Sequence, residues 1–374
     1  MKEYTESVNF IDLSAQQKKI RKNIEVAIKN VLDHGQYIMG PEVSILENKL
    51  KDFTGAKNVY SCANGTDALT IAMMALDFQP GDVVFVPSFT YVASAESAAL
   101  IGIVPFFVDV DKETFNIDPQ SLCRGILEAK KLNLNPVGII AVDLFGQPAN
   151  YEELRNIADR EGLKIIADGA QSLGASYKDK NVGMLGDIST TSFFPAKPMG
   201  CYGDGGALFT DDSELGDKIN SIRLHGRGVE KYDHTSIGIN SRLDTIQAAI
   251  LIEKLKIFPE EILKRNEIAK AYHKIFDSCD YASSPKIIEG NISSWAQYTL
   301  IVEERDSFQN KLKNIGIPSV IYYPKSLTNQ PAYVNYPTLS KGTPISDELC
   351  NKVLSLPMHP YLKKSTIEKI ASIL

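Results

Sequence analysis

Apolar residues recur at helical intervals near the start of the chain. In residues 20–32 and 43–53 they follow one another at intervals of three and four positions, which is the pattern of a helix that buries one face. Gly40 and Pro41 interrupt the pattern between these segments, and such a pair is typical of a turn. We therefore expect two helices joined by a turn.

From residue 58 onward, short apolar runs alternate with helical patterns. The runs have the length of buried strands and lie at 58–62, 83–86, 104–108, 138–142 and 163–167. Helical patterns separate several of them, at 67–75, 93–100 and 151–161. This alternation predicts an α/β fold with a mostly parallel sheet that helices cover on both faces. Ligands of such sheets bind in the loops at the carboxyl ends of the strands.

The pattern changes near Asn240. Helical patterns follow at 244–256, 260–276 and 365–374, and strand patterns lie at 296–302 and 319–323. One long helix suits a connector between two domains, and the chain beyond it is long enough for a small core. We expect residues 1–250 to form a large α/β domain and residues 251–374 to form a smaller C-terminal α+β domain.

The composition is that of an ordinary globular protein. The 374 residues are 44% hydrophobic and carry a formal net charge of -6. This acidic balance argues against nucleic acid and anionic membranes as partners, although it leaves room for a local basic pocket that binds a phosphorylated small molecule. No segment has the apolar length that crosses a bilayer.

The cysteines and the N-terminus indicate a cytoplasmic protein without a metal site. The cysteines are odd in number, widely spaced and without a CxxC pair, at positions 62, 123, 201, 279 and 350. This spacing argues against zinc and against a disulfide framework. Residues 1–10 lack the basic flank and apolar core of a secretion signal.

A single lysine lies in a loop of aromatic, proline and glycine residues. Residues 192–200 read SFFPAKPMG, and CYGDGGA follows at once. Such a loop has a restricted backbone, and loss of solvent around Lys197 would lower the pKa of its amine and make it a nucleophile. Taken alone, a solvated surface lysine is the commoner role.

Two further motifs suggest groups that hold a charged ligand. Asp168 ends the apolar run IIAD, so its carboxylate faces the ligand crevice and could hold a ring nitrogen protonated; a helix N-cap is an equal alternative. In residues 62–69, CANGTDAL, Gly65 and Thr66 lie where a strand gives way to a helix. The N–H groups at a helix start bind phosphate, although a plain turn is also compatible with this motif.

The three motifs together supply what pyridoxal phosphate (PLP) requires. That cofactor needs an amine for its aldehyde, an acid for its pyridine nitrogen and a cradle for its phosphate. Lys197, Asp168 and the Gly65–Thr66 turn provide these groups on one α/β pattern. Their combination is far more specific than any one of them.

With these motifs the chain resembles the DegT/DnrJ/EryC1/StrS family of sugar aminotransferases, from about residue 10 to the last helix. The likeness is carried by ANGTDAL at 63–69, PSFTYVA at 87–93, DGAQ at 168–171, the segment 192–207, GINSRLD at 238–244 and QAA at 247–249. It implies a fold-type I aminotransferase that forms a homodimer with its active sites at the interface.

The resemblance also implies a role for individual residues. Lys197 would form the Schiff base, Asp168 would hold the pyridinium nitrogen, and Tyr91 would stack on the cofactor ring. The remaining cofactor contacts would come from Gln171 near the phenolic oxygen, from Gly65, Thr66 and Ser192 at the phosphate, and from Asn240 of the other subunit. Without the resemblance, Tyr91 would be read as core packing and Ser192 as a strand hydroxyl.

The substrate is suggested by two C-terminal segments. SLPMHPYL at 355–362 and YYPK at 322–325 resemble enzymes that act on UDP-linked 3-keto-N-acetylglucosaminuronic acid. This implies L-glutamate as amino donor, a product for surface polysaccharide, and Tyr322, Tyr323 and Arg242 as substrate contacts. A guanidinium binds carboxylates of the sugar or of glutamate in a two-pronged geometry, although Arg242 could instead form an interface salt bridge.

Two departures and several rival functions remain. Ala167 stands where many relatives have a glutamate, which leaves the acid Asp168 in place and changes its surroundings. Tyr322 stands where many similar relatives have a histidine, which leaves individual sugar-nucleotide contacts open. Another 3- or 4-keto nucleotide sugar could be the substrate. A non-enzymatic PLP-binding regulator is a rival, and a sugar 3-dehydratase is disfavoured because that class carries histidine where Lys197 stands. An oxidoreductase is suggested only by the glycines at 203–206, which lack a GxGxxG after a first strand.

Overall fold

The computed structural model describes residues 8–230 and 232–374. Its centre is a seven-stranded sheet in the order β1-β9-β8-β5-β4-β2-β3. The strands are β1 (Asn58–Cys62), β2 (Asp82–Pro87), β3 (Val104–Val108), β4 (Asn135–Val142), β5 (Lys164–Asp168), β8 (Ile188–Ser192) and β9 (Gly206–Thr210). Strand β9 runs antiparallel to both of its neighbours, and the other ladders are parallel. The predicted α/β fold with a mostly parallel sheet is thus confirmed.

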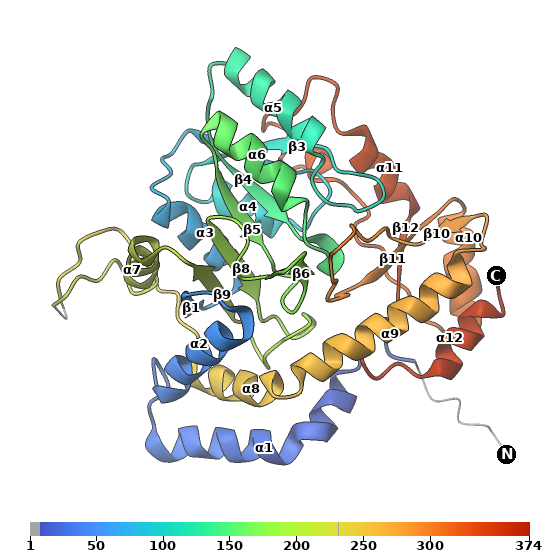
Figure 1. Ribbon diagram of the computed structural model, residues 1–374, viewed down its shortest axis with the longest axis horizontal. Helices are drawn as coiled ribbons and strands as arrows, with labels where there is room; N and C mark the ends of the chain where they lie inside the picture. Colours follow the sequence, from blue (N-terminus) through green and yellow to red (C-terminus); the bar gives the residue numbers. More distant parts are fainter. Residues whose placement is uncertain (1–7, 231) are drawn as a thin grey trace.

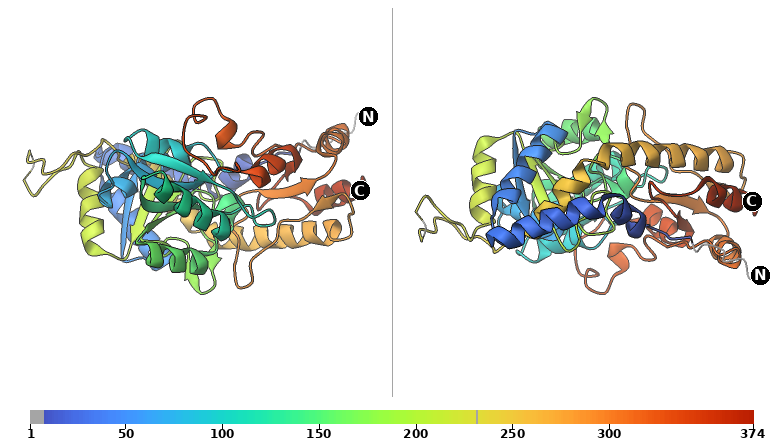
Figure 2. Two further views of the ribbon diagram at one scale, coloured as in Figure 1. Left: turned by 90° about the horizontal axis from the view of Figure 1, so that it is seen from above. Right: turned by 90° about the horizontal axis from the view of Figure 1, so that it is seen from below.

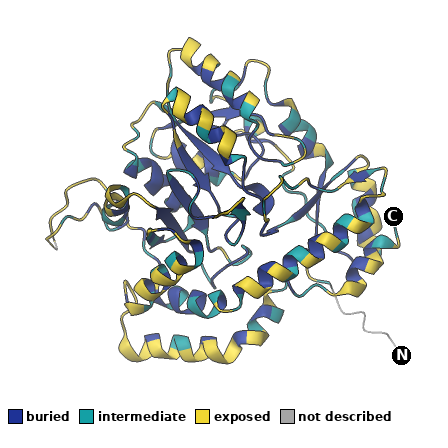
Figure 3. Ribbon diagram, in the orientation of Figure 1, coloured by how far each residue is buried: buried dark blue, intermediate teal, exposed yellow. Residues whose placement is uncertain are grey.

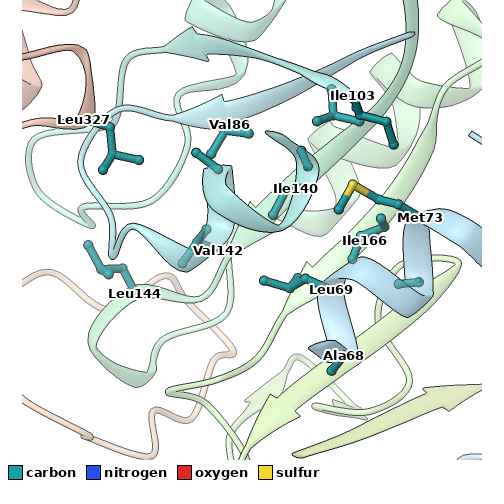
Figure 4. Close-up of a cluster of buried hydrophobic side chains, with 14 of the residues drawn as sticks. Ala68, Leu69, Met73, Val86, Ile103, Ile140, Val142, Leu144, Ile166 and Leu327 are labelled. Carbon is teal, nitrogen blue, oxygen red and sulfur yellow. The ribbon is translucent and has the colours of Figure 1, made fainter. Parts of the chain in front are cut away.

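Helices cover both faces of this sheet (Figures 1 and 2). Alternate residues of a strand point to opposite faces, so Ile140 of β4 packs with Leu69 and Met73 of α3 (Gly65–Ala75), whereas Ile139 packs with the helices of the other face. Figure 4 shows the first cluster, in which Ile140 and Ile166 meet α3. The face that packs on α3 also carries α4 (Ala93–Ala99) and α7 (Ser213–Ile222). The opposite face carries α5 (Pro119–Lys131) and α6 (Tyr151–Glu161).

The N-terminal helices pack beside the start of a connector. α1 (Leu13–His34) and α2 (Pro41–Thr54) both contact α8 (Thr245–Leu255), and Gly40 lies between them as the expected turn. Lys256 and Ile257 separate α8 from α9 (Phe258–Phe276), which reaches toward the C-terminal part of the molecule (Figure 1). Figure 3 shows that these helices expose their outer faces, while the central sheet is buried.

The C-terminal part has its own small sheet and core. β11 (Tyr298–Val302) pairs with β10 (Ala282–Ser283) and β12 (Val353–Leu356). Helices α10 (Arg305–Asn314), α11 (Pro344–Lys352) and α12 (Lys364–Ala371) complete it. The cluster around Tyr272, Tyr298 and Leu354 forms its core. The expected division into residues 1–250 and 251–374 stays a prediction.

The prediction of a strand at residues 319–323 is wrong. Residues 319–323 make a single bridge, Val320 to Ser355, and then leave the sheet. Pro318 and Pro324 flank this segment and lack the N–H groups that a ladder needs. The segment instead carries Tyr322 and Tyr323 toward the cavity described below.

No helix of the described chain is long and apolar enough to cross a membrane. All five cysteines are free. Among residues 8–230 and 232–374, no group of three or more His, Cys, Asp or Glu side chains is arranged to hold a metal ion.

Candidate active site

A cavity of about 430 Å³ lies at the carboxyl ends of β5 and β8, where the fold predicts a ligand. Nearly all the residues singled out from the sequence line it, although the chain brings them from distant segments: Gly65, Thr66, Tyr91, Asp168, Gln171, Ser192, Lys197, Tyr322 and Tyr323. This volume is typical of a small-molecule site.

Asp168 is the buried acid of the cavity. It is the last residue of β5, is 5% exposed, and accepts hydrogen bonds from Ser94 Oγ at 2.7 Å and from the Ala170 N–H at 3.2 Å. Burial raises the pKa of Asp168, while both hydrogen bonds and the charge of Lys197 act in the opposite direction. In the described chain β5 is followed directly by a turn and then by β6, so Asp168 does not precede a helix and the alternative role as an N-cap is wrong.

Lys197 lies in the loop between β8 and β9 and faces the same cavity. Burial lowers the pKa of the Lys197 amine, and the charge of Asp168 opposes that shift. An amine with a lowered pKa is more often neutral at physiological pH and therefore more nucleophilic. The alternative of a fully solvated lysine does not describe this side chain.

The backbone of the Lys197 loop is held by hydrogen bonds at both ends. The Phe193 N–H donates to Gly205 O at 2.7 Å, and the Cys201 N–H donates to Phe193 O at 2.7 Å. Lys254, which is 2% exposed, donates from Nζ to Gly200 O. Burial lowers the pKa of Lys254 to about 8. This second buried lysine supports the loop, so Lys197 is presented from a fixed backbone.

The start of α3 forms a cradle for an anion. Asn64 caps the helix by accepting the Asp67 N–H at 2.8 Å, and the helix begins at Gly65. A Cβ atom at Gly65 would lie 2.8 Å from Ser192 Cβ, so glycine is what brings the Ser192 hydroxyl close to this end of the helix. The first N–H groups of a helix have no intrahelical partner and bind phosphate.

Aromatic side chains form part of the cavity wall. Tyr91 is 55% exposed at the cavity, and its ring centroid lies 6.1 Å from that of Tyr323. Tyr91 is therefore not a core residue. Gln171 joins Tyr323 to the turn after β4, because its Nε2 donates to Tyr323 Oη at 3.3 Å and its Oε1 accepts the Phe145 N–H at 2.7 Å.

Two predicted residues lie outside the cavity of the single chain. Asn240 is exposed and pairs with Leu224 in an isolated bridge. Arg242 has a buried Nε atom without a hydrogen-bond partner in the described part of the chain. Neither residue lines the cavity.

Sequence reasoning missed several residues of the site. Ser94, Thr90, Phe194 and Gln297 line the cavity. Ser94 contacts Asp168 across 74 positions of sequence. Ser94 and Thr90 belong to or adjoin the PSFTYVA segment, which could have drawn attention to them, but no local pattern marks Gln297.

The residues present fit PLP. An amine with a lowered pKa, a buried acid, a helix start without side-chain obstruction and an exposed aromatic ring surround one cavity. Lys197 would hold the aldehyde carbon, Asp168 the ring nitrogen, and Gly65, Thr66 and Ser192 the phosphate.

Comparison with known proteins identifies the class to which this site belongs. The chain belongs to the DegT/DnrJ/EryC1/StrS aminotransferase family, whose model matches residues 18–374. The family comprises PLP-dependent nucleotide-sugar aminotransferases.

Curated relatives and solved structures match this chain over nearly its whole length. The UDP-2-acetamido-2-deoxy-3-oxo-D-glucuronate aminotransferase of Pseudomonas aeruginosa is 47% identical over 367 residues, which are 98% of this chain and 99% of the relative. A DegT DnrJ EryC1 StrS aminotransferase from Brucella abortus is 47% identical, with a TM-score of 0.96 over 98% of each chain. The structure of ntda from Bacillus subtilis with bound cofactor PMP is 27% identical, with a TM-score of 0.86 over 97% of this chain and 82% of that one. The expected fold-type I architecture is thereby confirmed.

Proposed function

We propose that this enzyme transfers the amino group of L-glutamate to UDP-2-acetamido-2-deoxy-3-oxo-D-glucuronate, and that the product serves the biosynthesis of a surface polysaccharide in the cytoplasm. The proposal of amino-group transfer is supported by one observation: Lys197, Asp168 and the start of α3 all line the same cavity. The choice of sugar is supported by 47% identity to the Pseudomonas aeruginosa aminotransferase for that compound.

The chain's own side chains divide the work of the transfer. PLP, when bound, supplies an electron sink that stabilises negative charge at the carbon that loses its proton. Lys197 Nζ, whose pKa is lowered by burial, would take a proton from the Cα atom of the amino acid and pass it to the cofactor carbon that bears the nitrogen. In the second half-reaction it would move a proton from that carbon to the sugar carbon that receives the amino group. Asp168, which is 5% exposed, would keep the ring nitrogen protonated. One lysine serves both half-reactions.

The function is tested directly by product analysis. The purified enzyme is incubated with L-glutamate and a panel of UDP- and dTDP-linked 3-keto and 4-keto sugars, and the products are identified by mass. We expect an amino sugar from the 3-keto-uronate in preference to the others. Preferred turnover of another sugar would replace the proposed substrate, and the absence of any product would favour the non-enzymatic regulator.

A homodimer with shared sites is the second part of the proposal. A projecting segment between α7 and α8 exposes Val229 and Ile237 at 95% and 86%, and it extends away from the body of the molecule (Figure 1). Tyr37 and Ile38 are also about half exposed. Apolar side chains on a segment that projects from the molecule are available for contact with a partner subunit. Asn240, at the base of the projecting segment, would then reach the partner's cofactor.

Subunit mixing tests this sharing. A Lys197→Ala subunit and an Asn240→Ala subunit are each expected to be impaired alone, but their heterodimer combines wild-type Lys197 of one subunit with wild-type Asn240 of the other. Random exchange of equal amounts should restore about a quarter of the wild-type sites, because half of the dimers are mixed and each has one intact site. Turnover after verified exchange is the measurement. No recovery would show that each subunit builds its site alone.

Arg242 is the proposed partner of the sugar carboxylate. Among the described residues its Nε has no hydrogen-bond partner, and Arg242 does not line the cavity of the single chain. The proposal is supported by the two-pronged geometry with which a guanidinium binds a carboxylate. Arg242→Ala should weaken binding of the uronate by ~2–5 kcal/mol and spare the cofactor, and Arg242→Lys should restore part of the loss because it keeps the charge without the fork.

An uncharged substrate analogue is the control for the Arg242 variants. Kinetics are compared between the 3-keto-uronate and its uncharged 6-hydroxymethyl analogue, with the glutamate half-reaction followed separately. Equal losses for both sugars would remove the uronate role. A defect confined to the glutamate half-reaction would assign Arg242 to the donor, and a fall in dimer stability would indicate an interface ion pair.

A further inference from the structure

The cavity contains one buried polar atom that has no hydrogen-bond partner. Among the described residues, Gln297 Oε1 is the unpaired buried side-chain atom whose residue lines the cavity. Buried polar groups in folded proteins are almost always paired, and leaving one unpaired is unfavourable. A group of this kind in a ligand cavity therefore points to a partner that the ligand brings.

The backbone around Gln297 is fixed against the main sheet. Gln297 directly precedes β11, and its N–H donates to Phe145 O at 3.3 Å. Three positions earlier, Ser294 donates from its N–H to Gly146 O at 3.0 Å and from Oγ to Gln171 O at 2.8 Å. These bonds tie the segment to the loop after β4 and to a predicted cofactor residue. The Gln297 carboxamide is thus presented to the cavity from a rigid position.

The charge of the cavity decides which ligand group fits this carboxamide. Within the described part of the chain, Lys197 is the one basic side chain that lines the cavity, and Asp168 and Asp204 are its acids. Within this subunit, a carboxylate of glutamate or of a uronate therefore finds no cation other than Lys197 in the cavity lining. A carboxamide oxygen accepts from neutral O–H and N–H groups, and sugars carry several of these.

From this placement we infer that Gln297 is a specificity-determining contact for the nucleotide sugar, and that its carboxamide accepts a hydrogen bond from a neutral hydroxyl or acetamido N–H of the sugar. The inference rests on the proposed function and names one of its substrate contacts. Gln297 does not take part in proton transfer. It affects the half-reaction with the sugar and leaves the half-reaction with the amino acid unchanged.

The test separates the two half-reactions in Gln297→Met, which keeps the side-chain length and removes the amide. The glutamate half-reaction is followed by the absorbance of the bound cofactor, and the sugar half-reaction is followed after the enzyme has been loaded with glutamate. Binding of the UDP-linked amino-sugar product is measured separately by calorimetry. We expect the sugar half-reaction and product binding to weaken by ~10–100-fold, as for a lost hydrogen bond to a buried group, while the glutamate half-reaction keeps its wild-type rate.

Two further variants exclude a merely structural effect. Gln120→Leu removes an exposed amide from α5, no residue of which lines the cavity, and should behave as wild type. Gln297→Asn keeps the amide on a shorter arm and should retain more sugar binding than Gln297→Met. The preserved glutamate half-reaction reports in every variant that the site is folded.

The outcomes distinguish this inference from the proposed function. Wild-type sugar kinetics in Gln297→Met, equal losses in both half-reactions, or a loss confined to glutamate would each overturn the assignment of Gln297 while the aminotransferase function stood. A wild-type enzyme that reacts with glutamate but with no nucleotide keto-sugar would reject the proposed function, and the assignment of Gln297 would fall with it.

Discussion

Replacing Lys197 by alanine is expected to lower turnover by at least ~10³-fold, because the variant loses both the nucleophile and the general base. The burial that lowers the pKa of this amine also disfavours its charged form in the folded protein. Its removal should therefore leave the melting temperature of the cofactor-free protein unchanged or slightly higher. Release of 2-oxoglutarate from L-glutamate is the measurement of activity.

Chemical rescue sharpens the test of Lys197. A small primary amine in solution can take the place of the missing base, so ethylamine should restore part of the turnover of Lys197→Ala. Lys180→Ala is a matched control because Lys180 is exposed on β7 (Lys180–Asn181). Full activity of Lys197→Ala without added amine would disprove its assigned role.

Replacing Asp168 by asparagine is expected to lower turnover by roughly 10²–10⁴-fold, the cost of removing one partner of a buried charge pair. The amide has nearly the same shape and can still meet Ser94 Oγ, but it has no negative charge with which to keep a ring nitrogen protonated. Turnover at saturating substrate and the absorbance of the bound cofactor are the measurements.

Stability separates this role of Asp168 from a structural one. Because burial raises the pKa of the carboxyl group, its folded-state pKa lies above the unfolded value, so ionisation at neutral pH weakens folding of the cofactor-free protein. The asparagine variant should then be as stable as wild type or more stable, and most clearly so above the folded-state pKa. Asp159→Asn, on the exposed side of α6, is the control. A large loss of stability with retained activity would make Asp168 a structural residue.

The central strands show where hydrophobic patterning succeeds and where it fails. The apolar runs before Val142 and Asp168 predicted β4 and β5, because both strands are buried by helices on two faces. β8 was missed although it is equally central. Its sequence ISTTS is polar, yet Thr190 Oγ1 donates to Ala167 O and Thr191 Oγ1 to Gly169 O, so the strand satisfies its hydroxyls within the fold.

The sequence by itself determined the chemistry of the site. A lysine among prolines, an acid at the end of an apolar run and a small polar turn before a helix are local patterns, and their order on an α/β pattern indicates PLP. The nature of these groups depends on residue type, and the fold class depends on hydrophobic periodicity. The chemical groups and the fold class can therefore both be predicted from residues that are close together in the sequence.

Only the tertiary structure decided how these groups are tuned and what else faces the ligand. The lowered pKa of Lys197 and the raised pKa of Asp168 arise from burial. Ser94 reaches Asp168 across 74 positions, and Gln297 lines the cavity from the position directly before β11 of the small sheet. Burial and contacts between distant segments are set by the packing of the whole chain, so no local pattern contains them.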